Sequence, residues 1–215
     1  MNDKFNITQE QNILLTIRNL ADYIWKSANL EGIAVTYPET YAILNGINVP
    51  GVNVEGVVTI NNLKHAWQFV IDTADYIMDY PYICKLHQYI GANLIYGAGN
   101  IGIVPININK TERKPEFLVQ ESIIMEDLQD IFQIEEITEQ AITLMLYLMR
   151  KQLFLAGNKL VAMLSANQIM ISHGKGVISV PQKYHQEFRQ ILVEYFETGK
   201  KNRIENYIYE TSIDG

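Results

Sequence analysis

The sequence contains few of the features that mark secreted or membrane proteins. Its 215 residues include one cysteine, Cys84, so no disulfide can form within the chain. No stretch approaches the roughly 18 consecutive apolar residues of a membrane span. The segment Met1 to Glu10 is polar and lacks the apolar core of a signal peptide. We therefore expect a cytoplasmic protein that does not bind a membrane, and we expect Cys84 to pack in the core.

Positive charge is also scarce. The chain has 17 Lys and Arg against 24 Asp and Glu, a formal net charge of −7. Its two basic clusters, Lys110–Lys114 and Lys200–Arg203, are short and dilute. Such a chain repels a phosphate backbone, so we expect no nucleic-acid partner.

The remaining composition is that of an ordinary folded protein. Hydrophobic residues make up 48% and charged residues 19% of the chain, which supports neither a disordered nor a fibrous class. The length allows a full hydrophobic core and favours one domain over two. No repeat, low-complexity tract or flexible linker divides the sequence, so we expect a single domain over residues 1–215.

Most of the sequence has the apolar spacing of amphipathic helices, which predicts an all-α, mainly helical fold. Thr8 is expected to cap the first helix and Gly32 to end it, while Pro38 and Pro81 suit the first turns of two others. Residues 47–58 contain glycine and proline and are expected to form an ordered loop. Helices are expected over residues 8–32, 36–46, 59–78, 81–96, 117–134, 138–153, 161–173, 181–196 and 200–209.

Two segments have strand-like patterns. Between Gly97 and Lys110, glycines and alternating isoleucines predict a short exposed β-hairpin, which Pro105 confines to an edge. A brief strand is expected at Val177–Val180. Of the helical segments, 138–153 is strongly apolar and is expected to be central.

The pair Gly157–Asn158 lies where two apolar helices meet. Glycine allows positive φ and close approach of the backbone, and the N–H groups of the next residues point outward along the helix dipole. This pattern suits an anion-binding loop. It also suits a simple turn between two helices.

The residues around this pair resemble a known motif. Gln152-Leu153-Phe154-Leu155-Ala156-Gly157-Asn158-Lys159-Leu160 is similar to the active-site motif of the Fic (Fido) family, His-Pro-Phe-x-Asp/Glu-Gly-Asn-Gly/Lys-Arg. Phe154, Gly157 and Asn158 match it, and Lys159 matches a variant with lysine. The residues Ser27-Ala28-Asn29-Leu30-Glu31-Gly32 resemble the family's inhibitory motif, Ser/Thr-x-x-x-Glu-Gly/Asn. The resemblance covers most of the chain.

The resemblance implies a Fic fold with three functional parts. They are an N-terminal inhibitory helix (1–35), a flap hairpin (97–110), and the motif loop with the start of the next helix (152–163). In the family, ATP and Mg²⁺ bind at the loop, and the motif histidine deprotonates a target hydroxyl so that AMP passes to a protein. Doc-type members transfer a phosphate instead.

The motif is degenerate at the positions that carry this chemistry. Gln152 replaces the catalytic histidine, and an amide cannot accept a proton near neutral pH. Ala156 replaces the metal-binding carboxylate, and Leu160 replaces the phosphate-binding arginine. Weak or absent binding of ATP and Mg²⁺ is therefore expected. Lys159 supplies a point charge without the fork of an arginine.

The resemblance also assigns roles to individual residues. Gly157, Asn158 and Lys159 are expected to bind nucleotide phosphates, and Gln152 occupies the catalytic position. In the flap, the residues that would align a protein target by strand addition are Ile103, Val104 and Ile106. The alternation of the flap is equally compatible with a plain surface hairpin.

Ser27, Glu31 and Gly32 are the expected inhibitory residues. The family's inhibitory glutamate meets a motif arginine, but this chain has Leu160 and Met163 at the two arginine positions. We therefore expect the Glu31 carboxylate to lie within hydrogen-bond or one-water reach of Asn158, Lys159 or the loop backbone. The alternative is that these residues form an ordinary helix C-terminus.

No other set of residues predicts a catalytic or metal site. His65, His87, His173 and His185 lack metal-ligand spacing and are interpreted as interface or surface histidines. Two functions follow. The chain is either an autoinhibited, catalytically impaired AMP (nucleotidyl) transferase, or a non-catalytic regulator that binds a nucleotide or a protein on a Fic fold.

Overall fold

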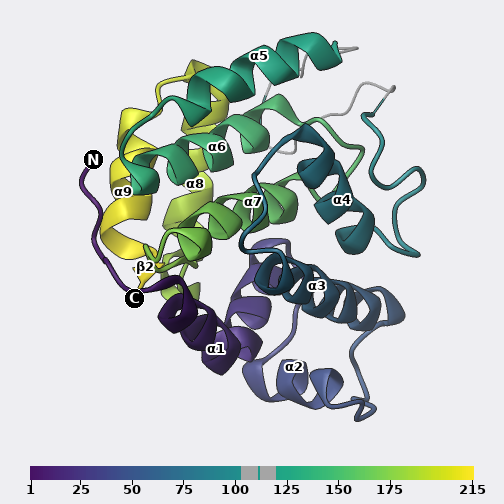
Figure 1. Ribbon diagram of the computed structural model, residues 1–215. Helices are drawn as coiled ribbons and strands as arrows, with labels where there is room; N and C mark the ends of the chain where they lie inside the picture. Colours follow the sequence, from purple (N-terminus) through teal and green to yellow (C-terminus); the bar gives the residue numbers. More distant parts are fainter. Residues whose placement is uncertain (103–110, 112–119) are drawn as a thin grey trace.

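The computed structural model describes residues 1–102, 111 and 120–215. Within them the chain is mainly helical, and its helices gather around α7 (Figure 1). The elements are α1 (Gln9–Leu30), α2 (Tyr37–Leu44), α3 (Val54–Asp72), α4 (Tyr80–Ile90), α5 (Glu121–Phe132), α6 (Ile137–Lys151), α7 (Asn158–Ser172), β1 (Val177–Ile178), η1 (Gln182–Tyr184), α8 (His185–Thr198), α9 (Asn202–Thr211) and β2 (Ile213–Asp214).

Helix α7 is the centre of the fold. All of its residues from Leu160 to Ile171 are buried, and the helix contacts α1, α3, α4, α6 and β1. The segment expected to be central, 138–153, corresponds to α6, which packs along α7. The buried apolar residues around this pair form one continuous cluster. The loop between α6 and α7 is therefore held by two helices that lie in the core of the described chain.

The starts of the helices follow from their cap residues. Thr8 and Thr36 each form a capping box, in which the threonine hydroxyl accepts from the third helical N–H and the side chain at that position accepts in return. Helix α6 has no side-chain cap of its own. Asp3 supplies one, since its Oδ1 accepts from the Thr138 N–H at 2.9 Å and from the Thr138 hydroxyl at 2.7 Å.

Two helices in this region differ from the sequence expectation. Helix α3 begins at Val54, inside the segment expected to be a loop, because the Asn53 side chain accepts from the Gly56 N–H at 2.8 Å and caps the helix. It ends at Asp72, not at residue 78. There the Gln168 amide donates to the Tyr76 carbonyl at 2.7 Å and fixes the turn that follows.

Helix α4 also ends early, at Ile90 rather than near residue 96. The Asn62 amide donates to the carbonyls of Ile90 and Ala92 at 3.0 and 2.7 Å, which satisfies the helix end from a neighbouring helix. The helix expected from Pro181 begins as the 3₁₀ turn η1 and continues as α8. Such tertiary contacts carry no signal in the local sequence.

The strands within the described residues lie far apart in the sequence. β1 pairs antiparallel with β2, with Val177 opposite Asp214 and Ile178 opposite Ile213. This confirms the start of the strand expected at 177–180. Of the expected flap hairpin, residues 103–110 lie outside the described residues, and residues 97–102 form turns and irregular structure. No helix among the described residues is both long and apolar enough to cross a membrane.

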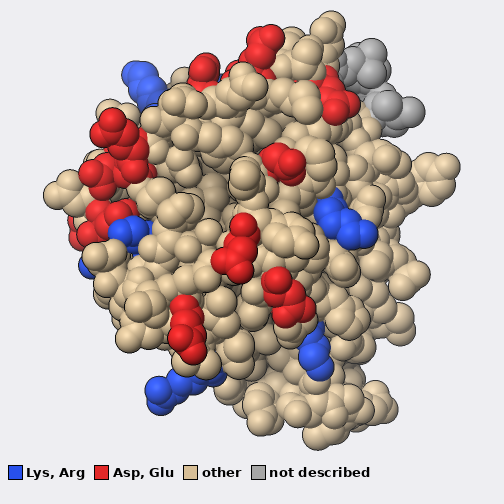
Figure 2. Space-filling model, viewed as in Figure 1, with Lys and Arg blue, Asp and Glu red and all other residues tan. Residues whose placement is uncertain are grey.

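Charge is unevenly spread over the face in Figure 2. Acidic side chains gather toward α5 and α9, and the basic side chains on this face are scattered singly. This distribution matches the negative net charge of the sequence.

Candidate anion-binding site

The site is built on the sharp turn between α6 and α7. Helix α6 ends at Gln152, which has the left-handed conformation (φ 54°, ψ 55°), and Gly157 adopts a similar one (φ 73°). Two left-handed residues let the chain reverse within a few residues. The first turn of α7 therefore opens directly onto this loop.

Asn158 holds the loop closed. Its side chain is 6% exposed; Oδ1 accepts from the Phe154 N–H at 3.0 Å and Nδ2 donates to the Phe154 carbonyl at 2.7 Å. Both polar atoms of the amide are thus used within the loop.

The N-terminus of α7 lacks a side-chain cap from the described residues. The N–H groups of Asn158, Lys159 and Leu160 have no partner within the helix, because the first intrahelical bond runs from Val161 N to Gly157 O at 3.0 Å. Unpaired N–H groups and the helix dipole together favour an anion at this end. Lys159 adds one positive charge.

Glu31 pairs with the Lys159 ammonium. Its Oε2 lies 2.8 Å from Lys159 Nζ, and the same ammonium is 3.4 Å from the Leu30 carbonyl oxygen. The side chains of Lys159 and Glu31 are 28% and 20% exposed, so the pair is largely shielded from water. The second carboxylate oxygen of Glu31 is buried and has no hydrogen-bond partner among the described residues. The contact expected between Glu31 and Lys159 is confirmed.

The other residues of the expected inhibitory motif shape the end of α1. The Ser27 carbonyl accepts from the Glu31 N–H at 3.1 Å, and Gly32 leaves the helix with φ 95°. Arg189 of α8 donates to the carbonyls of Asn29 and Leu30 at 2.7 and 3.1 Å. The sequence did not predict this cap, although α1 has no basic residue in its last turn to satisfy those carbonyls.

Among the described residues, no side chain takes over the chemistry of the degenerate positions. The Gln152 amide donates to the Met149 carbonyl at 2.6 Å, so one of its two N–H donors is already engaged. Ala156 is exposed and carries no ligand atom. Leu160 and Met163 are each 4% exposed and belong to the core. Within the described part of the chain, no group of three or more His, Cys, Asp or Glu residues is placed to hold a metal ion.

His87 joins α4 to the loop. It is 1% exposed, and its ring stacks on Phe154 with centroids 3.9 Å apart and planes inclined by 9°. Its Nδ1 accepts from the Gly99 N–H at 2.8 Å, and its Nε2 lies 3.0 Å from the Ala156 carbonyl oxygen. Burial lowers the pKa of His87 below its usual range, against a smaller opposing effect of the Ala156 bond. The sequence placed His87 at an interface or the surface, without these contacts.

The other histidines lie away from the loop. His65 and His173 are exposed. His185 is buried, and its Nε2 lies 3.0 Å from the Val180 carbonyl oxygen. Cys84 is partly buried and packs against the core, as expected.

The start of the expected flap passes beside the loop. The Gly102 N–H donates to the Leu153 carbonyl at 2.8 Å, so the chain enters the flap segment next to the Gly157 turn. Ile103, Val104 and Ile106 lie outside the described residues. Their role in aligning a target stays a prediction.

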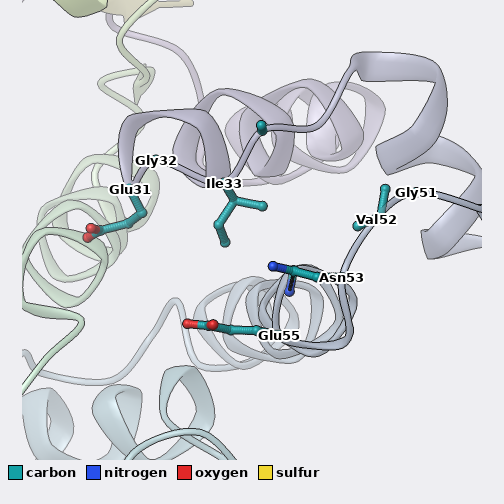
Figure 3. Close-up of a pocket in the computed structure, with 9 residues that line it drawn as sticks. Glu31, Gly32, Ile33, Gly51, Val52, Asn53 and Glu55 are labelled. Atoms are coloured by element: carbon teal, nitrogen blue, oxygen red, sulfur yellow. Dashed lines mark hydrogen bonds between the residues drawn. The ribbon is translucent and has the colours of Figure 1, made fainter.

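A pocket of about 380 Å³ opens at the end of α1. One wall comes from Glu31–Ala34, and the other comes from the start of α3 and the residues before it, namely Gly51, Val52, Asn53, Glu55 and Gly56. In Figure 3 the Glu31 side chain points away from Val52 on the opposite wall, while Ile33 points into the space between the walls. Glu31 thus belongs both to this pocket and to the ion pair with Lys159.

Comparison with known proteins gives one consistent result. No family model and no curated protein matches the sequence. The structure is similar to Fic-1 from C. elegans (TM-score 0.73, 18% identity, covering 94% of this chain and 68% of that one). It is similar to a Fic family protein from Desulfovibrio desulfuricans G20 (TM-score 0.77, 14% identity, covering 95% of this chain and 66% of that one).

A Fic domain containing signaling protein from Bacteroides thetaiotaomicron VPI-5482 is also similar (TM-score 0.77, 16% identity, covering 95% of this chain and 87% of that one). The chain spans about two thirds of the C. elegans and Desulfovibrio structures. Helical architecture, loop position and these superpositions agree: the chain has the Fic fold.

Proposed function

We propose that this chain binds the phosphate groups of a nucleotide at the N-terminal end of α7, and that Glu31 holds the site closed from the end of α1. We further propose that transfer of AMP to a protein is impaired. The observation that carries the proposal is the 2.8 Å contact between the Glu31 carboxylate and Lys159. A carboxylate of the chain itself sits where an anionic ligand would be stabilised.

The electrostatics of the loop support an anionic ligand. The first N–H groups of α7 and the Lys159 ammonium supply positive potential without any metal ion. A phosphate that displaced Glu31 would take over the same ammonium. Binding therefore competes with an internal ion pair, so we expect weak affinity in the unmodified chain.

The chemistry for transfer is reduced in three places. Gln152 offers no basic atom, and its amide donor is bonded to Met149. Ala156 offers no oxygen to Mg²⁺, which usually depends on one or two protein carboxylates. Leu160 is buried in the core, so nothing replaces a bidentate cation at that position. These residues do not fit the Mg²⁺–ATP complex that the Fic resemblance implies.

The second candidate is a slow protein adenylyltransferase, and the Fic fold favours it. In this case the segment 103–108 would align the target, and ATP with Mg²⁺ would be required. The two candidates differ in their dependence on metal. A binding protein built on backbone N–H groups and Lys159 binds nucleotides equally well with and without Mg²⁺, whereas a transferase needs the metal.

Isothermal titration calorimetry with ATP, ADP and AMP, each with and without Mg²⁺, tests the proposal. We expect metal-independent binding that weakens several-fold in Lys159→Gln. The matched control is Lys64→Gln. Lys64 lies on α3 and, like Lys159, donates to the carbonyl of the last residue of a helix, in this case Leu44 of α2. Binding that appears only with Mg²⁺ would favour the transferase. Absence of binding by both the unmodified chain and Glu31→Gln would refute the proposal.

A further inference from the structure

His87 contacts three separate segments of the loop region through one ring. It belongs to α4, which packs against α7. Its partners are the Phe154 ring, the Ala156 carbonyl and the Gly99 N–H. A histidine that is 1% exposed and so connected is part of the construction of the site.

The hydrogen bonds fix the tautomer of the ring. A backbone N–H can only donate, so the Gly99 N–H at 2.8 Å requires an unprotonated Nδ1. The proton of the neutral ring then lies on Nε2, which donates to the Ala156 carbonyl at 3.0 Å. An imidazolium would place a second donor against Gly99. The geometry thus selects the neutral Nε2–H form.

The contact with Ala156 sets the direction of the next peptide. The Ala156 carbonyl belongs to the peptide group between Ala156 and Gly157. Gly157, with φ 73°, is the N-cap residue of α7. A Cβ at Gly157 would lie 3.3 Å from Ile90 Cγ2 and 3.7 Å from His87 Nε2, so the loop rests directly on α4. Orienting this peptide orients the N–H groups that follow it.

The stack with Phe154 reaches the loop by a second route. Phe154 is fully buried, and both its backbone N–H and its carbonyl bond to the Asn158 side chain. A ring held 3.9 Å from Phe154 therefore also fixes the residue that closes the loop. Among the described residues, burial and the Ala156 hydrogen bond shift the pKa of His87, and no charged side chain adds to them.

We propose that His87 is a positioning residue of the anion site: as the neutral Nε2–H tautomer it ties the Ala156 carbonyl, Phe154 and Gly99 together and so aims the first N–H groups of α7. The inference rests on the proposed function only for its ligand. The geometry of the loop can be measured without any ligand.

Two variants separate the contributions of the ring. His87→Phe keeps a flat ring against Phe154 but leaves the Ala156 carbonyl and the Gly99 N–H without partners. His87→Gln keeps a donor and an acceptor but loses the stack. We expect His87→Phe to lower the hydrogen-exchange protection of the hydrogen-bonded amides of Gly99, Phe154 and Val161 by about tenfold, the effect of one lost buried hydrogen bond. His87→Gln should recover most of that protection.

Spectroscopy and a matched control complete the test. In the unmodified chain, ¹⁵N NMR of the imidazole should show protonation at Nε2 and not at Nδ1. His185→Gln is the control, because His185 is also buried and bonded to a carbonyl, that of Val180, away from the loop. It should leave the amides of the loop as protected as before. ADP titration of the same variants should show affinity falling in parallel with protection.

The outcomes are distinct for the two proposals. An Nδ1–H tautomer, or loop protection unchanged in His87→Phe, would overturn the role of His87 whether or not a nucleotide binds. Loss of protection in His87→Phe, with no binding of ADP to either the unmodified chain or Glu31→Gln, would uphold His87 and refute the phosphate site.

Discussion

The Glu31 carboxylate at the end of α1 and the Lys159 ammonium in the first turn of α7 form an ion pair 2.8 Å long. The two residues are far apart in the sequence and join the start of the central helix to the first helix of the chain. The pair engages the ammonium that would otherwise be available to an anion at this end of α7.

Replacing Glu31 should open the site. In Glu31→Gln the Lys159 ammonium loses its ionic partner, so ADP no longer competes with a carboxylate of the chain. We expect calorimetry to show ADP binding several-fold tighter than in the unmodified chain. Asp22→Asn is the control, since it breaks another ion pair of α1, with Lys26. Equal affinities in Glu31→Gln and Asp22→Asn would contradict the closed-site interpretation.

Removing the Asn158 side chain should loosen the loop. Asn158→Ala leaves the buried N–H and carbonyl of Phe154 unpaired, which costs about 2–3 kcal/mol of unfolding free energy. Urea denaturation measures this difference. Asn45→Ala serves as the comparison, because Asn45 makes one exposed bond to the Tyr41 carbonyl and its loss should have a small effect. Similar losses of unfolding free energy in both variants would show that the Asn158 side chain does not hold the loop closed.

A methyl group at Gly157 should be more harmful than one at Gly46. Both glycines have positive φ, 73° and 76°, so Gly→Ala imposes the same backbone strain of about 1 kcal/mol at each. Only at Gly157 would the new Cβ press on Ile90 and Ile95, at 3.3 and 3.4 Å. Thermal unfolding should therefore show a larger decrease for Gly157→Ala. An equal decrease in unfolding temperature for the two variants would mean that Ile90 and Ile95 move away from the new Cβ at no cost in stability.

The contact of Asp3 with the start of α6 should make stability depend on pH. Burial tends to raise the pKa of Asp3, but hydrogen bonds from Thr138 and Lys175 outweigh it and hold the pKa below its usual value. The ionised form is thus favoured in the folded state. Its stabilisation is complete above about pH 4 and is lost as the pH falls through the lowered pKa.

The test is the unfolding temperature of Asp3→Asn. At pH 7 it should lie about 2–4 °C below that of the unmodified chain, and the gap should narrow at acidic pH. Asp130→Asn, on the exposed surface of α5, should leave the temperature unchanged. A gap that stays constant down to the acid limit would refute the assignment of the effect to the charge of Asp3.

Labelled ATP tests the impairment of transfer. Loss of a general base alone lowers a rate about 10²- to 10⁴-fold, so the unmodified chain should label itself and lysate proteins far more slowly than a Fic protein with an intact motif. Gln152→His, Ala156→Asp and Leu160→Arg with Glu31→Gly restore the motif residues. Because Leu160 is 4% exposed, its arginine variant should also lower stability by about 3 kcal/mol. Rapid labelling by the unmodified protein would contradict the proposal.

The sequence predicts the starts of α1 and α2 well because their caps are local signals, whereas α3 was expected to start at residue 59 instead of Val54 although its cap, Asn53, is local too. Thr8 and Thr36 cap the helices that directly follow them. Helix ends were predicted less accurately. Gln168 and Asn62 end the neighbouring turns of α3 and α4 through side chains that come from other helices, which a reading of apolar spacing cannot detect.

In the candidate site, too, contacts between local motifs were predicted, and contacts from distant elements were not. The pairing of Glu31 with Lys159 followed from two motifs, each contained in a few consecutive residues. His87 and Arg189 bind the loop and the end of α1 from distant elements, and a lone histidine or arginine on an amphipathic helix resembles any surface residue. Only the packing of α4 and α8 reveals their contacts.

The antiparallel pairing of β1 with β2 places residues near both ends of the sequence at the C-terminal end of α7. β1 follows α7 and pairs with Ile213–Asp214. In the turn between α7 and β1, the Gly174 carbonyl accepts from the Ile7 N–H. Gly157 lies at the opposite end of this 15-residue helix, about 22 Å away at the usual rise per residue. A fluorophore, an affinity handle or a surface tether placed at either end therefore leaves the Gly157 loop accessible.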